Sequence, residues 1–264
     1  MTVRHGEGSL AVNNHEQQQF EYLLRLGDSN LILGQRLSAW LGHAPVLEEE
    51  MATGNVALDL MGQARSWLGL AGELEGKGRD EDRLAYFRDA FDYRNVLLAE
   101  RPNGDYAYTI MRQFLYDAYH YPLLEQLSAS ANERIREIAA KSLKEVEYHL
   151  RRSSEWVIRL GDGTEESHRR TQDALDDLWM YTGEMLTPDG IDLALQEAGI
   201  GADLEQVAGF WHERVDAITA EATLTIPDES WMQQGGKQGR HIEHLGYVLA
   251  EMQHLPRSYP DARW

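Results

Sequence analysis

Long segments with helical hydrophobic periodicity account for most of this 264-residue chain. Apolar residues recur every three or four positions, which places them on one face of an α-helix. We expect helices over residues 15–41, 48–75, 82–100, 105–127, 133–160, 164–186, 191–198, 203–223 and 240–254. Strand-like alternation and domain linkers are missing. The sequence therefore predicts one all-α domain over residues 1–264, with a flexible segment at about 1–14 and a loop plus a last helix at about 225–264.

Four of the expected helices each carry one carboxylate inside an apolar stripe: Asp28, Asp59, Asp117 and Glu145. A buried carboxylate is costly unless a partner compensates it. Four carboxylates on four helices is also the arrangement that di-iron bundles use. The pattern thus predicts a ferritin-like helical bundle with additional C-terminal helices. A second interpretation, in which these are ordinary helix-face residues or isolated core acids, stays open at this point.

The histidines of such a site are largely missing. A di-iron centre needs two carboxylate–histidine pairs at a spacing of three residues. Gly62 follows Asp59 by three, and Tyr148 follows Glu145 by three. Asp117 and His120 keep the spacing, and His149 follows Glu145 by four. We expect a vestigial site without metal at these positions: Asp28, Asp59, Gly62, Asp117, His120, Glu145, Tyr148 and His149.

Two Glu-x-x-His strings occur elsewhere, at Glu165–His168 and Glu251–His254. They lie in the first turn of one expected helix and the last turn of another, so we expect solvent-exposed side chains rather than ligands. His241 and His244 also have ligand spacing, but they follow a glycine-rich loop, which favours a surface or interface role.

The carboxylates of a site without metal need cations that neutralise them. Lys141 precedes Glu145 by four residues on the same helix face, and Lys144 is adjacent to Glu145. We therefore hypothesise that a lysine ammonium occupies the space that a metal would fill.

Composition limits the functional classes. The formal net charge of −19 disfavours nucleic acid or an anionic membrane as a partner and is compatible with a basic protein. The chain has no cysteine, which excludes disulfides, thiolate metal sites and cysteine nucleophiles. The N-terminus lacks an apolar signal core and no apolar run approaches the ~20 residues of a membrane span, so we expect a cytoplasmic protein.

Several motifs together resemble the C subunits of bacterial phenylacetyl-CoA epoxidases, from about residue 22 to residue 264. The motifs are Leu24-Arg-Leu-Gly-Asp28, Gln35-Arg-Leu37, Trp40-Leu-Gly-His-Ala-Pro45, Leu58-Asp-Leu-Met-Gly-Gln-Ala-Arg65, Pro102-Asn-Gly104, Lys144-Glu145, Tyr148-His-Leu-Arg151, Arg159-Leu-Gly-Asp-Gly-Thr164, Gly235-Gly-Lys237, Glu243-His-Leu-Gly246 and Leu249-Ala-Glu-Met-Gln253.

This resemblance implies a ferritin-like, structural, non-catalytic subunit of a monooxygenase that converts phenylacetyl-CoA to its ring-1,2-epoxide in aerobic phenylacetate catabolism. It implies a heterodimer with a catalytic di-iron subunit, within a larger hetero-oligomer. It further implies a small accessory subunit and an NADPH-dependent reductase with FAD and an iron–sulfur cluster, with no cofactor in this chain. It also raises a contact between the CoA substrate and Asp92, Tyr93, Arg94 and Asn95, on an expected helix near the subunit interface, whereas a solvated helix face is the alternative.

Two other functions stay open from the residues alone. One is a di-iron oxygenase in its own right, which would use Asp28, Asp59, Asp117, His120, Glu145 and His149. The other is a ferritin-like binding or storage module.

Overall fold

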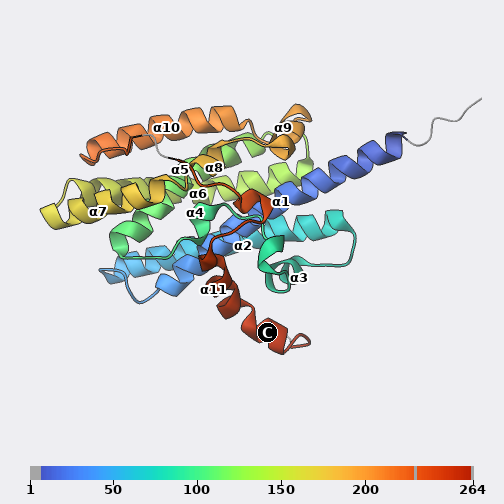
Figure 1. The fold of residues 1–264 in the computed structure, drawn as a ribbon, viewed down its shortest axis with the longest axis horizontal. Coiled ribbons are helices and arrows are strands. Elements are labelled where there is room, and N and C mark those ends of the chain that lie inside the picture. Colours follow the sequence, from blue (N-terminus) through green and yellow to red (C-terminus); the bar gives the residue numbers. More distant parts are fainter. Residues whose placement is uncertain (1–6, 229–230, 263–264) are drawn as a thin grey trace, which may run out of the picture.

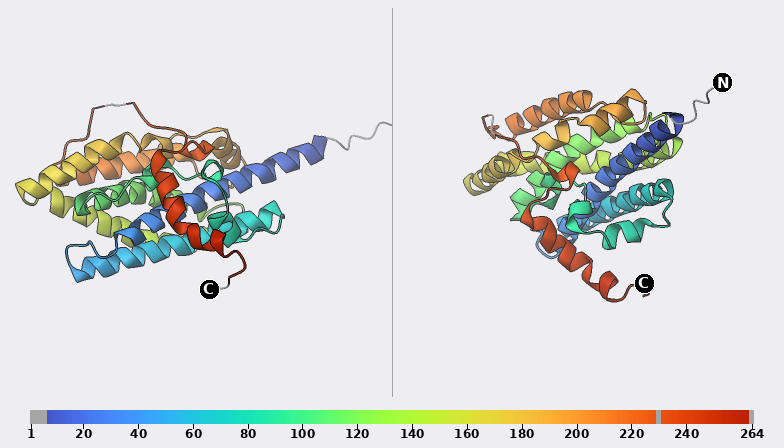
Figure 2. Two further views of the ribbon diagram at one scale, coloured as in Figure 1. Left: turned by 60° about the horizontal axis from the view of Figure 1, so that its bottom comes forward. Right: turned by 45° about the vertical axis from the view of Figure 1, so that its right-hand side comes forward.

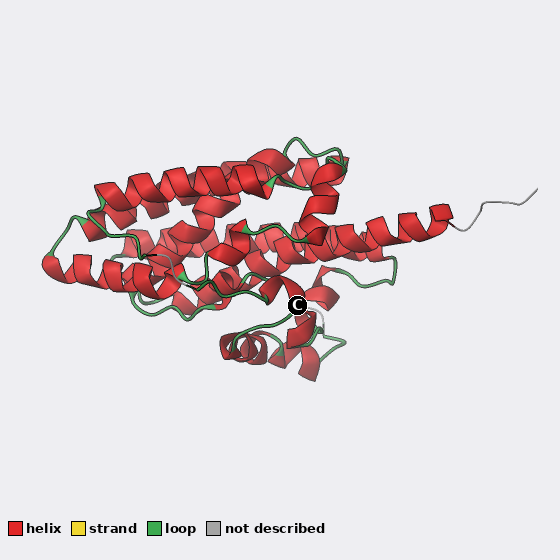
Figure 3. Cartoon of the chain, turned by 45° about the horizontal axis from the view of Figure 1, so that its top comes forward, coloured by secondary structure: helices red, strands yellow, loops and turns green. Residues whose placement is uncertain are grey.

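The predicted all-α fold is confirmed. The structure is a computed structural model, and it describes residues 7–228 and 231–262. Figure 3 shows helices joined by loops, with no strand in the described ranges. Buried apolar side chains from most of the helices form one continuous core. None of the described helices has the length and apolar character needed to cross a membrane.

Four long helices form the central bundle: α1 (Glu7–Trp40), α2 (Leu47–Glu75), α5 (Tyr106–Leu127) and α6 (Glu133–Gly161). Short turns join α1 to α2 and α5 to α6, and each of these pairs packs along its length. Helices α2 and α6 also touch, which links the two pairs. This is the arrangement that we expected for a ferritin-like bundle.

Four further helices follow the bundle along the chain. They are α7 (Glu165–Trp179), α8 (Gly183–Leu186), α9 (Gly190–Glu197) and α10 (Leu204–Glu221). Helices α7 and α10 pack on α5 and α6, whereas α9 packs on α1. Thr164 caps α7 by accepting a hydrogen bond from the Ser167 amide. The segment predicted as one helix over 164–186 is divided into α7 and α8.

The prediction of one helix over residues 82–100 is wrong. This segment contains α3 (Glu81–Tyr86), the 3₁₀ turn η1 (Ala90–Asp92) and α4 (Leu97–Glu100), with extended residues between them. Arg88 bends into the core, where it pairs with Asp28 on α1 and donates to the backbone carbonyl of Asp92. These contacts with distant parts of the chain outweigh the local helical periodicity.

The C-terminal segment runs back over the bundle. It contains the 3₁₀ turn η2 (Gly236–Gln238), α11 (Glu243–Met252) and α12 (His254–Ser258). Figure 2 shows α11 and α12 projecting from one side of the body. At the other end of the chain, α1 begins at Glu7, so residues 7–14 of the segment expected to be flexible are helical. Residues 1–6 lie outside the described residues.

Candidate functional site

The predicted ligand pairs on α2 and α6 do not face the bundle interior. Asp59 and Glu145 are half-buried, Gly62 is exposed and the Tyr148 side chain is 40% exposed. The buried pairs with the same spacing lie one residue later on both helices: Leu60 with Gln63, and Val146 with His149. One residue rotates a helix position by about 100°. The predicted register is therefore off by one, and the interior positions carry two aliphatic side chains, an amide and one imidazole.

Asp28 is buried, but it points away from this interior. Its carboxylate pairs with the Arg88 guanidinium, and Oδ2 also accepts from the backbone amide of Arg94 at 2.8 Å. Positions two residues apart lie on opposite sides of a helix, and it is Asn30 that enters the bundle. The prediction that Asp28 joins the other three carboxylates is therefore wrong.

A chain of hydrogen bonds crosses the bundle between its four long helices. Tyr116 on α5 donates to Asn30 on α1 at 2.7 Å, and the Asn30 amide donates to Gln63 on α2 at 3.2 Å. Gln63 in turn donates to Glu145 on α6 at 2.9 Å. Each helix thus contributes one polar side chain, and neutral amides and a phenol supply three of the four.

The pair Asp117 and His120 does lie in the interior. Asp117 accepts hydrogen bonds from Gln113 at 2.7 Å and from Ser153 on α6 at 2.8 Å. Burial raises the pKa of the Asp117 carboxyl to about 6. Burial likewise lowers the pKa of His120 to about 3, which keeps its imidazole neutral. His120 packs against the Tyr116 ring, with 5.1 Å between the ring centroids.

His149 pairs with a carboxylate. Its Nε2 lies 3.0 Å from Asp59 Oδ2, and the imidazole has no exposed surface. The buried His149 therefore supplies the partner that half-buried Asp59 needs.

The hypothesis that a lysine fills the space of a metal is wrong. Lys141 and Lys144 are both exposed, and among the described residues neither forms an ion pair within 4.0 Å of a carboxylate. The acids are compensated in other ways: Asp28 by Arg88, Asp59 by His149, and Asp117 by a hydroxyl and an amide. An arginine from a distant segment suits a buried, bidentate pair better than a lysine does.

The interior residues do not fit a di-iron centre. Such a centre needs several carboxylates that converge with histidines, whereas here the aliphatic side chains of Leu60 and Val146 stand where two of the bridging acids would be needed. Across the described ranges, no three His, Asp or Glu side chains gather closely enough to hold a metal ion. The arrangement can hold the four helices in register, but it lacks the donor set for activating oxygen.

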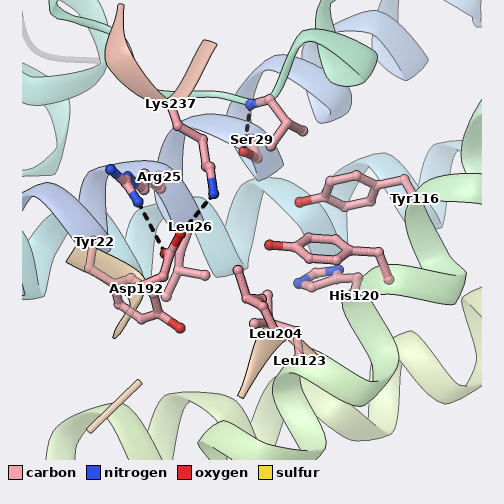
Figure 4. Close-up of a pocket in the computed structure, with 12 residues that line it drawn as sticks. Tyr22, Arg25, Leu26, Ser29, Tyr116, His120, Leu123, Asp192, Leu204 and Lys237 are labelled. Carbon is pink, nitrogen blue, oxygen red and sulfur yellow. Dashed lines mark hydrogen bonds and ion pairs between the residues drawn. The ribbon is translucent and has the colours of Figure 1, made fainter. Parts of the chain in front are cut away.

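A small enclosed cavity lies beside His120 (Figure 4). Its volume of about 20 Å³ accommodates roughly one water molecule. A substrate the size of a CoA thioester does not fit there. The cavity therefore does not provide a substrate site inside the bundle.

Sequence reasoning missed the ionic cluster on the other wall of this cavity. Arg25 on α1 pairs with Asp189 at 2.6 Å and with Asp192 at 3.0 Å, and Lys237 pairs with Asp192 at 2.7 Å. Figure 4 shows Arg25 and Lys237 converging on Asp192. This cluster fixes the Gly235–Gly239 loop to α1 and α9. A lysine directly after two glycines was the available signal, but its partners are 45 or more residues away.

The remaining histidine strings do not form ligand pairs. Glu165, Glu251 and His254 are exposed, as expected, and His168 is half-buried. The imidazole of His241 contacts the buried carboxylate of Glu100 at 2.9 Å and the Tyr93 carbonyl at 3.0 Å. His241 thus attaches the C-terminal segment to the end of α4.

The segment proposed to contact CoA is not a helix face. Tyr93 and Asn95 are completely buried, and the Asn95 amide donates to Glu100 at 2.9 Å. Arg94 pairs with Glu21 at 2.7 Å and donates to the carbonyls of Phe91 and Tyr93. The Asp92 carboxylate accepts a hydrogen bond from the backbone amide of Asp89, the N-cap of η1. Tyr93 and Asn95 cannot reach a substrate in this arrangement.

The fold and the interior together define an all-α bundle that keeps a polar centre without the ligands of a di-iron site. Comparison with known proteins gives the family. Residues 7–264 match the family model described as phenylacetic acid catabolic protein, and the chain belongs to this family. It is 48% identical over 243 residues to the C subunit of the 1,2-phenylacetyl-CoA epoxidase of Escherichia coli (strain K12). The match covers 92% of this chain and 98% of that relative.

Proposed function

We propose that this chain is a structural, non-catalytic subunit of a multicomponent monooxygenase that converts phenylacetyl-CoA to ring-1,2-epoxyphenylacetyl-CoA. In this proposal it forms a heterodimer with the catalytic di-iron subunit and stabilises it, within a larger hetero-oligomer in the cytoplasm. A small accessory subunit and an NADPH-dependent reductase with FAD and an iron–sulfur cluster complete the system. The chain itself carries no cofactor and binds neither nucleic acid nor membrane.

One observation carries the non-catalytic role. At the buried positions one residue after the predicted ligand pairs on α2 and α6, the side chains are Leu60 with Gln63 and Val146 with His149. These residues cannot bridge two irons, because bridging requires carboxylates. The name of the relative, an epoxidase C subunit, supports a place in the same kind of complex.

The test is co-expression of this chain with the other epoxidase subunits, followed by affinity purification through a tag on the catalytic subunit. We expect co-purification in fixed stoichiometry and epoxidation of phenylacetyl-CoA that is lost when this chain is omitted. Iron should remain with the catalytic subunit after the two chains are separated.

Two results would contradict the proposal. Stoichiometric iron and epoxidation by the isolated chain would show a di-iron oxygenase in its own right. A catalytic subunit that is equally stable, soluble and active without this chain would exclude the supporting role and leave a ferritin-like binding module.

A contact with the CoA substrate now depends on Arg94, since Tyr93 and Asn95 are buried. Arginine suits phosphate recognition, but Glu21 and two carbonyls already occupy its guanidinium. An Arg94→Ala variant of the assembled complex tests this contact. A raised KM for phenylacetyl-CoA with unchanged kcat would support it, whereas an unchanged KM would exclude it.

A further inference from the structure

The outward face of α2 is uncharged over three turns. Between Met51 and Gly62 the exposed positions are Met51, Asn55, Leu58 and Gly62. Leu47 continues this line toward the start of the helix. The exposed fractions are 69% for Leu47, 63% for Met51 and 71% for Leu58. We call these five residues the α2 seam. It extends about 23 Å along the helix, and exposed apolar surface of this kind marks an interaction site.

Gly62 on this seam has no internal explanation. A glycine inside a helix costs about 1 kcal/mol relative to alanine. At Gly27 on α1 a Cβ atom would lie 2.7 Å from Leu68, so that glycine permits close packing of α1 on α2. At Gly62 a Cβ atom would meet nothing within 4 Å. The absence of a side chain at Gly62 therefore leaves space on the outer surface of the bundle and does not serve packing in its interior.

A cleft opens beside Gly62, between α2 and α6. Its volume is about 200 Å³, and the Asp59 and Glu145 carboxylates line it, with Lys141 and Leu58 also contributing to its walls. Two acidic residues and one lysine therefore line the cleft. The volume lies below the ~300–1,000 Å³ of pockets that hold drug-sized molecules, but it suits one long side chain.

We propose that the α2 seam is the docking surface for a helix of another subunit of the complex, and that this helix inserts a lysine or arginine side chain into the cleft at Gly62. Leu47, Met51 and Leu58 pack against an apolar stripe of that helix, and Gly62 lets its backbone approach closely. The basic side chain lies against Asp59 and Glu145. This inference deepens the proposed function and rests on it.

Charge decides between the candidate occupants. A second copy of this chain would bring a net charge of −19 against another −19, with an acidic cleft on each side. Like charges facing each other across an interface suppress association, and complementary charges promote it. The acidic cleft therefore fits a basic helix from a different chain.

The test measures the affinity of this chain for the remaining epoxidase subunits, co-expressed and purified as one assembly. Three variants alter the seam: Leu58→Asp, Gly62→Leu and Glu145→Gln. Leu193→Asp on α9 is the matched control, because Leu193 is also an exposed leucine on a helix, with an exposed fraction of 53%. Thermal unfolding of each isolated variant checks its fold.

We expect Leu58→Asp and Gly62→Leu to weaken binding at least tenfold, while Leu193→Asp binds like wild type. Gly62→Leu should bind less tightly although its Tm is equal or higher, since leucine favours helix more than glycine. Glu145→Gln keeps an acceptor for Gln63 but removes one charge. It should weaken binding severalfold and make the affinity less sensitive to salt.

The proposal is overturned if Leu58→Asp and Gly62→Leu bind as tightly as wild type. It is also overturned if the isolated wild-type chain forms a dimer that Leu58→Asp dissociates, because a second copy then covers the seam. If wild-type chain fails to bind the other subunits at all, the proposed function itself fails. The two failures are therefore distinguishable.

Discussion

Three of the acids singled out in the sequence have specific protein partners. Asp28 has Arg88, Asp59 has His149, and Asp117 has Ser153 and Gln113. The sequence correctly indicates that acids lie among apolar residues. It does not identify their partners, because Arg88 lies 60 residues from Asp28 and His149 lies 90 residues from Asp59.

The buried ion pair between Arg88 and Asp28 should contribute strongly to stability. Arg88→Met leaves the Asp28 carboxylate buried without a cation and should lower the free energy of unfolding by ~3–5 kcal/mol. Urea denaturation of the isolated chain measures this change. Arg65→Met, which removes an exposed pair with Glu81, is the control and should change stability by less than about 1 kcal/mol. A loss below about 1 kcal/mol for Arg88→Met would contradict the buried ion pair.

The Asp117 carboxyl gives a prediction about pH. Burial raises its pKa from 3.8 to about 6, so the folded protein binds its proton more tightly than the unfolded chain does. Its contribution to stability is therefore complete below pH 3.8 and is lost as the pH rises through 6. Asp117→Asn, which cannot ionise, should remove this loss. Relative to the variant, wild type should lose roughly 2 kcal/mol between about pH 4 and pH 7.

Urea denaturation of both proteins at several pH values measures this difference. Asp173→Asn on the exposed face of α7 provides the matched control. Parallel pH profiles for wild type and Asp117→Asn would contradict the raised pKa.

The predicted interior positions on α2 and α6 are off by one residue. Half-buried Asp59 and Glu145 flank the interior stripe, and hydropathy does not separate a stripe position from its neighbour. The phase of a helix is fixed by the helices that pack around it. Buried Gln63 and His149 became recognisable as the interior polar residues only after α1, α2, α5 and α6 were placed together.

At the scale of elements, helices with uninterrupted periodicity were predicted to within a few residues, as α2, α5 and α6 show. The segment from Glu81 to Glu100 was not, because tertiary contacts of Arg88 with Asp28 and of the Val96 amide with Ser29 break its helical pattern. Glu100 then accepts from His241 and from the backbone amide of Ile242, which positions the start of α11. These contacts explain why α11 begins at Glu243 rather than at Arg240.

The contact between His241, just before α11, and Glu100 predicts that the stability of the protein depends on pH. Burial lowers the pKa of His241, but the hydrogen bond and the charge of Glu100, together with the Tyr93 carbonyl, outweigh burial, so the pKa lies above 6.5. The stabilisation is complete below about pH 6.5 and is lost as the pH rises through the raised value. The Tm difference between wild type and His241→Gln should therefore be larger at about pH 6 than at about pH 9.

Differential scanning calorimetry at the two pH values measures this difference. His254→Gln on exposed α12 is the control and should follow wild type at both. A difference that stays constant between the two pH values would show that the charge of His241 contributes nothing.

At the scale of the whole molecule, the C-terminal segment holds together parts of the chain that are distant in sequence. Glu184 accepts from the amides of Gly235 and Lys237, and Gln253 donates to the Arg88 carbonyl. The sequence indicated a loop and a last helix here, but not that they complete the core. Their partners lie 45 to 208 residues away along the chain.

Removal of residues 229–264 should therefore destabilise the entire chain. Without Lys237, buried Asp192 keeps Arg25 as its one cationic partner among the described residues, and the apolar surface beneath α11 is exposed to water. We expect a Tm lower by at least about 5–10 °C, because 1 kcal/mol corresponds to about 2–4 °C in proteins of this size. Circular dichroism during heating measures it. An unchanged Tm would show that the segment does not contribute to the stability of the rest of the chain.

The rotation of α2 and α6 about their axes determines which residues would have to be changed to build an oxygen-activating centre in this protein. Completing the sequence motif on the surface, by Gly62→His and Tyr148→His, would place imidazoles where water reaches them. Leu60→Glu, Gln63→His and Val146→Glu would address the interior instead. Such a redesigned protein would carry uncompensated acids until it is loaded with metal, so its folding should depend on iron supply.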